Sequence, residues 1–232
     1  MIRSNLENIY REIDKVCVKI GKDPKGILLV AVCKTFPVSA NLDAIGFGQF
    51  IFGENKIQEL VRKKSYLYLN GERNAKWHII GHLQSNKAKQ AVINADMFQC
   101  LDSIKLAHKL NEACIQLNRK FKVLIQINSS GEESKSGIKP DDLNGFLISL
   151  KQFEELEIMG LMSICAFNDN PEDSRAEFQF MKELFDKAKI FNGGNIDIKY
   201  LSIGMSSDYQ IAIEEGANII RLGTAIFGAR LK

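Results

Sequence analysis

The sequence predicts an α/β fold, a single (β/α)8 TIM barrel with one extra N-terminal helix. Three observations support this: eight short apolar runs rich in β-branched residues, helix-like stretches between them, and a length of 232 residues, which suits one barrel domain. Strand and helix alternate, and such alternation favours parallel βαβ units. Eight units in roughly 200 residues indicate closure into a barrel, with a doubly wound open sheet as the alternative.

The N-terminal stretch is predicted to form an amphipathic helix. Gly21 and Pro24 end the pattern, and before them apolar residues recur at helical spacing, namely Leu6, Ile9, Ile13, Val16 and Ile20. This helix comes before the first predicted strand.

The strands and the helices between them follow in order. The candidate strands are Ile27–Cys33, Phe50–Phe52, Trp77–Ile80, Met97–Leu101, Val123–Ile127, Ile158–Ile164, Ile198–Leu201 and Ile219–Leu222, of which the second and third are weakly marked. The clearest helical stretches are Ile57–Tyr68, Ser103–Leu117, Asp141–Leu150 and Pro171–Lys189. No linker or low-complexity stretch divides the chain, so residues 1–232 are interpreted as one domain.

Composition excludes several classes of protein. The formal charge of +3, from 31 basic and 28 acidic residues, is too small and too evenly spread for a nucleic-acid surface. The five cysteines are odd in number and never form C-x-x-C, so neither a disulfide framework nor a zinc site is indicated. No signal peptide or membrane span is found, and we expect a cytoplasmic protein that does not bind membranes.

Lys34 is the first candidate for chemistry. It follows the apolar run Leu28–Cys33, and barrel enzymes place their active residues where strands end. Partial desolvation at the rim would lower the pKa of its amine and suit it to attack a carbonyl. A solvated surface lysine is the alternative.

The loops after the seventh and eighth strands offer a second constellation. They contain Ser206, Gly223 and Thr224, small residues of the kind that cradle a phosphate at this place in barrels. Ser206 is expected to begin a helix, and the alternative is that Ser206 and Asp208 only cap it. Arg221 lies inside the eighth strand, where its charge needs either a ligand or an internal salt bridge.

Further polar residues follow other strands. Asn55 ends the block Phe52-Gly53-Glu54-Asn55, and Lys135 offers a second amine after the fifth strand. His78 and His82 have i, i+4 spacing, but the first is in a predicted strand and the second lies beyond a glycine, so no metal site is expected.

Taken in order, these segments resemble the pyridoxal phosphate homeostasis protein family, also called the YggS/PROSC group. The resemblance runs through nearly the whole chain and rests on six blocks: A-V-C-K-T-F-P at Ala31–Pro37, F-G-E-N at Phe52–Asn55, W-H-I-I-G-H-L-Q-S-N-K at Trp77–Lys87, E-E-S-K-S-G at Glu132–Gly137, G-L-M-S-I at Gly160–Ile164, and L-S-I-G-M-S-S-D followed by R-L-G-T-A-I-F-G-A-R at Arg221–Arg230.

The resemblance implies a barrel similar to the N-terminal domain of bacterial alanine racemase, with pyridoxal 5′-phosphate (PLP) as cofactor. Lys34 would form a Schiff base with it, and Arg221 would face the pyridine nitrogen. Ser206, Gly223 and Thr224 would hold the phosphate, and Asn55 would lie beside the ring.

The expected function is that of a PLP carrier or buffer in intracellular PLP homeostasis, which passes PLP to apo-enzymes and affects amino- and keto-acid pools indirectly. The racemase resemblance stops at the barrel, so no further domain is expected to supply a second acid/base group. Only Tyr209 is a candidate tyrosine near the cofactor, and surface packing is the alternative for it. A further hypothesis is that Lys135 helps to depress the pKa of Lys34 by like-charge repulsion, and a solvated lysine is the alternative. The alternatives are a PLP-dependent amino-acid racemase or decarboxylase, or a cofactor-free barrel enzyme acting on a sugar phosphate. We expect a monomer or weak dimer.

Overall fold

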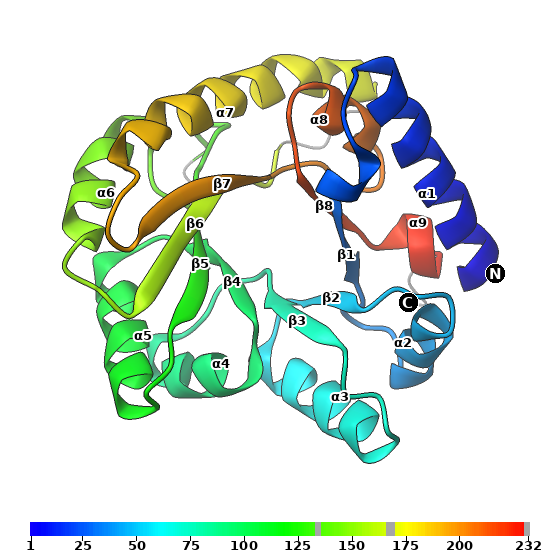
Figure 1. The fold of residues 1–232 in the computed structure, drawn as a ribbon, viewed down its shortest axis with the longest axis horizontal. Helices are drawn as coiled ribbons and strands as arrows, with labels where there is room; N and C mark the ends of the chain where they lie inside the picture. Colours follow the sequence, from blue (N-terminus) through cyan, green and yellow to red (C-terminus); the bar gives the residue numbers. More distant parts are fainter. Residues whose placement is uncertain (133–135, 166–169, 230–232) are drawn as a thin grey trace.

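The structure, a computed structural model, describes residues 1–132, 136–165 and 170–229. Within these ranges, parallel strands form a closed barrel in which each strand pairs with the next and β8 returns to β1 (Figure 1). Closure of the sheet confirms the predicted TIM barrel and excludes the open-sheet alternative. The strands are β1 (Leu28–Val32), β2 (Ile51–Glu54), β3 (Lys76–Ile79), β4 (Met97–Leu101), β5 (Phe121–Gln126), β6 (Leu156–Met162), β7 (Ile196–Ser202) and β8 (Ile219–Leu222).

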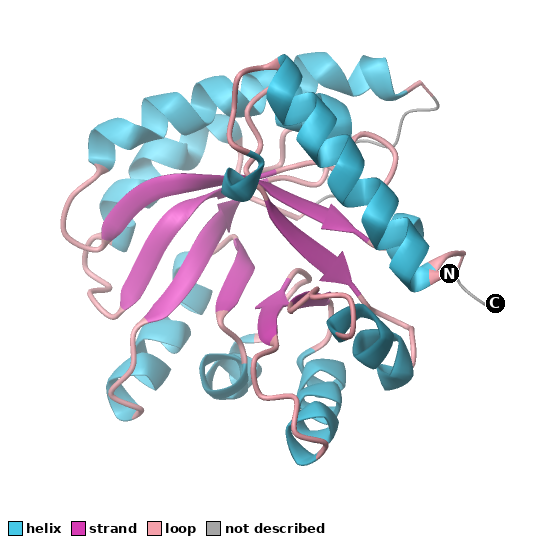
Figure 2. Cartoon of the chain, turned by 45° about the vertical axis from the view of Figure 1, so that its right-hand side comes forward, coloured by secondary structure: helices cyan, strands magenta, loops and turns pink. Residues whose placement is uncertain are grey.

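Helices surround the barrel on its outer side, as Figure 2 shows. They are α1 (Ile2–Lys19), α2 (Val38–Ile45), α3 (Ile57–Leu69), α4 (Ala88–Asn94), α5 (Ile104–Gln116), α6 (Leu143–Leu150), α7 (Arg175–Ala188), α8 (Tyr209–Glu214) and α9 (Thr224–Phe227). The predicted helix at Pro171–Lys189 is divided, because a 3-10 turn at Pro171–Ser174 precedes α7. No helix in the described part of the chain is long and apolar enough to cross a bilayer.

The extra helix α1 covers one side of the barrel. It packs against α8 and α9, which have only six and four residues and shield little of the barrel wall (Figure 1). The apolar face of α1, including Leu6, Ile9 and Ile13, is buried there. Burial of each such side chain contributes about 1.5–3 kcal/mol. The Asn5 side-chain amide also donates to the Ile226 carbonyl at 2.9 Å, which ties α1 to α9.

The barrel interior contains polar as well as apolar side chains. Most strand residues are buried and apolar, but His78, Gln99, Ser202 and Arg221 are also buried, on β3, β4, β7 and β8. In a barrel of parallel strands, the carboxyl ends of all strands meet at one mouth. The residues that follow β1, β2, β3, β7 and β8 are therefore brought together there.

Candidate functional site

A cavity of about 390 Å³ opens at this mouth of the barrel. Small-molecule sites typically occupy about 300–1,000 Å³, so the cavity suits a compact ligand. Every site residue predicted from the sequence lines it: Lys34, Asn55, Ser206, Arg221, Gly223 and Thr224. The remaining lining residues are Val32, Ile80, Gly81, Ile164, Met205 and Ser207, which supply mainly apolar walls.

A tight turn presents Lys34 to the cavity. β1 ends at Val32, and the Phe36 amide donates to the Cys33 carbonyl at 3.1 Å, which closes a turn with Lys34 and Thr35 at its centre. Thr35 has a φ of 69°, a left-handed conformation that is unfavourable for a β-branched residue. The Lys34 side chain is half-buried, so the turn holds an amine at the rim of the cavity.

Asn55 is held by close packing of β2 against the end of β3. Gly81 follows β3, and a Cβ atom placed on it would lie 2.8 Å from the Asn55 carbonyl oxygen and 2.9 Å from the Asn55 Cα. Cβ atoms in proteins essentially never lie this close to another non-bonded atom. Gly81 is therefore required for Asn55 to occupy its place on the cavity wall.

Ser206 joins the loops that follow β7 and β8. Its hydroxyl accepts hydrogen bonds from the amides of Gly223 and Ala225, each at 3.2 Å. A hydroxyl that accepts two hydrogen bonds retains its own proton for donation. The two loops thus meet at one corner of the cavity, where the Ser206 O–H is a donor that an anion could accept.

The expectation that Ser206 begins a helix is wrong. Helix α8 begins at Tyr209, and Ser206 lies in the turn before it. The Asp208 carboxylate does not cap α8 but accepts the Met205 amide at 2.6 Å. This contact fixes the turn and leaves the Ser206 hydroxyl for the loop after β8.

Arg221 enters the cavity wall from inside the barrel. Its Nη1 donates to the Ser202 hydroxyl at 2.6 Å and its Nη2 to the Ser163 carbonyl at 2.7 Å. Among the described residues no carboxylate forms an ion pair with it, so the internal salt bridge considered from the sequence is not found there. Burial lowers the pKa of Arg221 from its usual value.

The Ser202 contact continues through the barrel interior. The Ser202 hydroxyl donates to Gln99 Oε1 at 2.7 Å, and Gln99 Nε2 lies 2.8 Å from His78 Nδ1. The guanidinium can only donate, so the Ser202 hydroxyl accepts from it and donates its own proton to Gln99 Oε1. Gln99 Nε2 then donates to His78 Nδ1, which must accept. This requires a neutral imidazole, in agreement with burial, which lowers the pKa of His78 to about 4. We refer to Arg221, Ser202, Gln99 and His78 as the interior relay.

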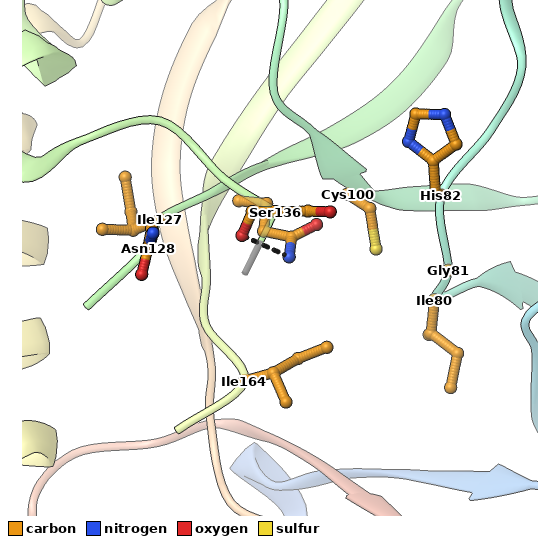
Figure 3. Close-up of a pocket in the computed structure, with 9 residues that line it drawn as sticks. Ile80, Gly81, His82, Cys100, Ile127, Asn128, Ser136 and Ile164 are labelled. Atoms are coloured by element: carbon orange, nitrogen blue, oxygen red, sulfur yellow. Dashed lines mark hydrogen bonds between the residues drawn. The ribbon is translucent and has the colours of Figure 1, made fainter. Parts of the chain in front are cut away.

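A smaller pocket of about 180 Å³ adjoins the cavity and shares Ile80, Gly81 and Ile164 with it. Figure 3 shows Ile80 and Ile164 among the residues that line this pocket. The Gln126 side-chain amide donates to the Ser136 carbonyl at 3.0 Å. Burial raises the pKa of the Cys100 thiol in its wall to about 12, which keeps that thiol protonated. This pocket extends the site toward β4 and β5.

Other residues singled out from the sequence are not brought to the cavity. Tyr209 is the first residue of α8 and does not line it; Tyr209 packs against the core on the side where Glu12 of α1 lies. His82 lines only the smaller pocket, and its side chain is exposed. No metal-binding group of three or more His, Cys, Asp or Glu occurs among the described residues. Lys135 lies outside the described residues.

Sequence reasoning missed the residues behind the cavity, above all Ser202 and Gln99. The available signal was their polarity, because Gln99 lies in the middle of an apolar strand and Ser202 directly follows one. Their partners lie 103 and 21 positions away in the chain, so polarity alone does not identify them.

Together the fold and the site define a (β/α)8-barrel protein whose mouth combines a lysine amine, a buried arginine and a set of anion-binding donors. The family model for the alanine racemase N-terminal domain matches residues 2–231. A pyridoxal phosphate homeostasis protein of Haemophilus influenzae is 41% identical over 99% of this chain and 96% of its own length. One of Aquifex aeolicus is 33% identical, over 97% and 96%. The chain therefore belongs to the pyridoxal phosphate homeostasis protein family, whose barrel is of the alanine racemase N-terminal type.

Solved structures agree with this assignment. PipY of Synechococcus elongatus with PLP bound has a TM-score of 0.84 and 31% identity, over 98% of this chain and all of its own. Alanine racemase of Clostridium difficile in complex with cycloserine has a TM-score of 0.71 at 17% identity, over 98% of this chain and 59% of its own. The latter is a likeness of fold alone.

Proposed function

We propose that this protein binds PLP as a Schiff base on Lys34 and acts as a PLP carrier or buffer in PLP homeostasis. One observation supports this above all: a single cavity is lined by the amine of Lys34 and by the donors grouped around Ser206. PLP has an aldehyde at one side and a phosphate at the other, and both need a partner in one cavity. The names of the relatives and the PLP-bound PipY structure point to the same cofactor.

The residues present fit the cofactor. Ser206, Gly223 and Thr224 would hold the phosphate, at the corner where the loops after β7 and β8 meet. Arg221 would face the pyridine nitrogen, and Asn55 would lie beside the ring. The apolar walls Val32, Ile80 and Ile164 suit the faces of an aromatic ring.

Two features favour a carrier over an enzyme. PLP supplies an electron sink when its pyridine nitrogen is protonated, but an arginine can only donate to that nitrogen and would leave it unprotonated. Among the described residues that line the cavity, Lys34 and Arg221 are the only titratable side chains. A racemase needs a second acid/base group, and arginine does not give up its proton. A PLP-dependent racemase or decarboxylase remains the alternative function.

Transfer of PLP to an apo-enzyme tests the carrier proposal. The loaded protein is mixed with an apo PLP-dependent enzyme, and the activity regained by that enzyme is followed with time. We expect transfer from the unmodified protein, and no PLP loading or transfer with Lys34→Ala. Racemisation or decarboxylation of amino acids by the loaded protein, at about 1 s⁻¹ or faster, would overturn the carrier proposal in favour of an enzyme.

Three further points stay predictions. We expect residues 1–232 to behave as one domain, the protein to be a monomer or weak dimer, and its location to be the cytoplasm.

A further inference from the structure

A buried ion pair lies directly behind the cavity, and no sequence motif predicted it. Lys63 of α3 and Glu54, the last residue of β2, are joined at 2.5 Å with side chains 1% and 0% exposed. Neither residue lines the cavity. Desolvating two charges costs several kcal/mol per ion, and apolar replacements of such pairs are often no less stable. Stability alone is therefore a poor reason for this pair.

The pair contacts the backbone that carries Lys34. Lys63 Nζ donates to the Cys33 carbonyl at 2.6 Å, and this is the same carbonyl that accepts the Phe36 amide and closes the turn. Glu54 directly precedes Asn55. The pair thus ties together the ends of β1 and β2, from which two residues of the proposed PLP site project.

The turn has a reason to need this support. Thr35 lies in the left-handed region, which is unfavourable for a β-branched residue, and such a conformation persists only where its surroundings hold it. A hydrogen bond from an ammonium group is roughly twice as strong as one between neutral groups. Lys63 supplies such a bond at the residue just before Lys34.

The Glu54 carboxylate also has a second partner. The Cys33 thiol lies 3.3 Å from Glu54 Oε1, the oxygen that Lys63 contacts, and burial raises the pKa of this thiol to about 12. The protonated thiol is therefore a donor to the carboxylate. Glu54 Oε2 has no hydrogen-bond partner among the described residues. Lys63 is thus the cation on which the Glu54 carboxylate depends.

We propose that Glu54 and Lys63 are positioning residues for the Lys34 amine: Lys63 holds the strained turn, and Glu54 neutralises Lys63 so that the pair behind the turn carries no net charge. This inference rests on the proposed function. It assigns to the pair two effects on PLP binding, one through the geometry of the turn and one through charge.

The charge effect has a sign that a purely structural role does not produce. In Lys63→Met, the carboxylate left behind favours a protonated Lys34 amine, so the pH midpoint for adduct formation rises by about one unit. At a fixed pH below that midpoint, about tenfold less amine is then unprotonated.

In Glu54→Gln, the ammonium that remains on Lys63 disfavours a second cation at Lys34, and the pH midpoint for adduct formation falls. The double variant Glu54→Gln/Lys63→Met returns the midpoint toward that of the unmodified protein but lowers the yield, because the contact on the Cys33 carbonyl is lost.

The experiment titrates the visible absorbance of each PLP-loaded variant against pH and measures the PLP fixed by borohydride. Lys64→Met is the matched control, since Lys64 lies on the same helix but donates to the Asn94 carbonyl, away from the turn. We expect opposite shifts in the two single variants and none in the control. Absence of fixed PLP in the unmodified protein would refute the proposed function instead.

Three results would overturn the inference while leaving the function intact. The single variants could shift the midpoint in the same direction, or behave like Lys64→Met. Alternatively, every Glu54 and Lys63 variant could fail to fold, as judged by circular dichroism, while the control folds. That outcome would make the pair a structural element only.

Discussion

The guanidinium of Arg221 and the hydroxyl of Ser202 are joined by a 2.6 Å hydrogen bond inside the barrel. Ser202 is fully buried, and Arg221 is only 5% exposed. The bond therefore links Arg221, which lies in the cavity wall, to Ser202, Gln99 and His78, the other members of the interior relay. The orientation of Arg221 depends on groups that no ligand in the cavity touches.

Ser202→Ala removes the acceptor of Arg221 Nη1 and the donor to Gln99 Oε1. Leaving buried partners unsatisfied costs about 1–3 kcal/mol each, so we expect the free energy of unfolding to fall by at least that amount. We also expect weaker PLP binding, because Arg221 loses one of its two anchors. Urea denaturation and a PLP titration measure the two effects. Unchanged values in both would show that the relay does not hold Arg221.

Stability should depend on His78 at acidic pH. Because the pKa of His78 falls from 6.5 to about 4 on folding, the unfolded chain binds the proton more readily between these values. The contribution of neutral His78 to the free energy of unfolding is complete above pH 6.5. It is lost as the pH falls toward 4, by up to about 3 kcal/mol. Urea denaturation across this range measures the loss. The variant His78→Gln should lack it, and parallel curves for the two proteins would contradict the assignment.

Ser206→Ala should weaken PLP binding through the phosphate. The Gly223 and Ala225 amides lose their common acceptor, and the corner loses its hydroxyl donor. We expect the Kd for PLP to rise about tenfold, which corresponds to about 1.4 kcal/mol. Pyridoxal, which has no phosphate, should bind both proteins equally. Ser149→Ala is the control, since the Ser149 hydroxyl donates to the Gly145 carbonyl on α6. A similar loss of affinity for pyridoxal would show that Ser206 does not act through the phosphate.

Gly81→Ala should displace Asn55. The added Cβ would approach the Asn55 backbone within 2.8–2.9 Å, and the backbone has to move. We expect lower affinity for PLP and a lower Tm. Gly145→Ala is the matched control, because nothing lies within 4 Å of the added atom and alanine suits a helix better by about 0.5–1 kcal/mol. Wild-type affinity in Gly81→Ala would show that Asn55 has room to shift without consequence.

The barrel could be predicted from the sequence because its cause is local. Each strand is a short apolar run, and the alternation with helices dictates parallel pairing. The boundaries were less accurate where burial and polarity conflict. β2 was predicted as Phe50–Phe52 but continues to Glu54, whose buried charge is compensated by Lys63 on the following helix. A sequence pattern does not reveal that compensation.

The cavity residues could also be predicted, because the ends of parallel strands meet at one mouth. Their supporting contacts could not, since they join distant segments such as Ser202 with Gln99. For Tyr209 the structure favours surface packing, the alternative that the sequence left open. Tyr209 follows β7 closely in sequence, but the Asp208–Met205 contact turns the chain first and places Tyr209 at the start of α8, away from the cavity.

Mapping the borohydride-reduced PLP adduct by mass spectrometry tests the central claim most directly. The account predicts one pyridoxyl group per chain, on the peptide that contains Lys34, and none in Lys34→Ala. A modification found mainly on another lysine, or PLP bound firmly without any reducible bond, would contradict it.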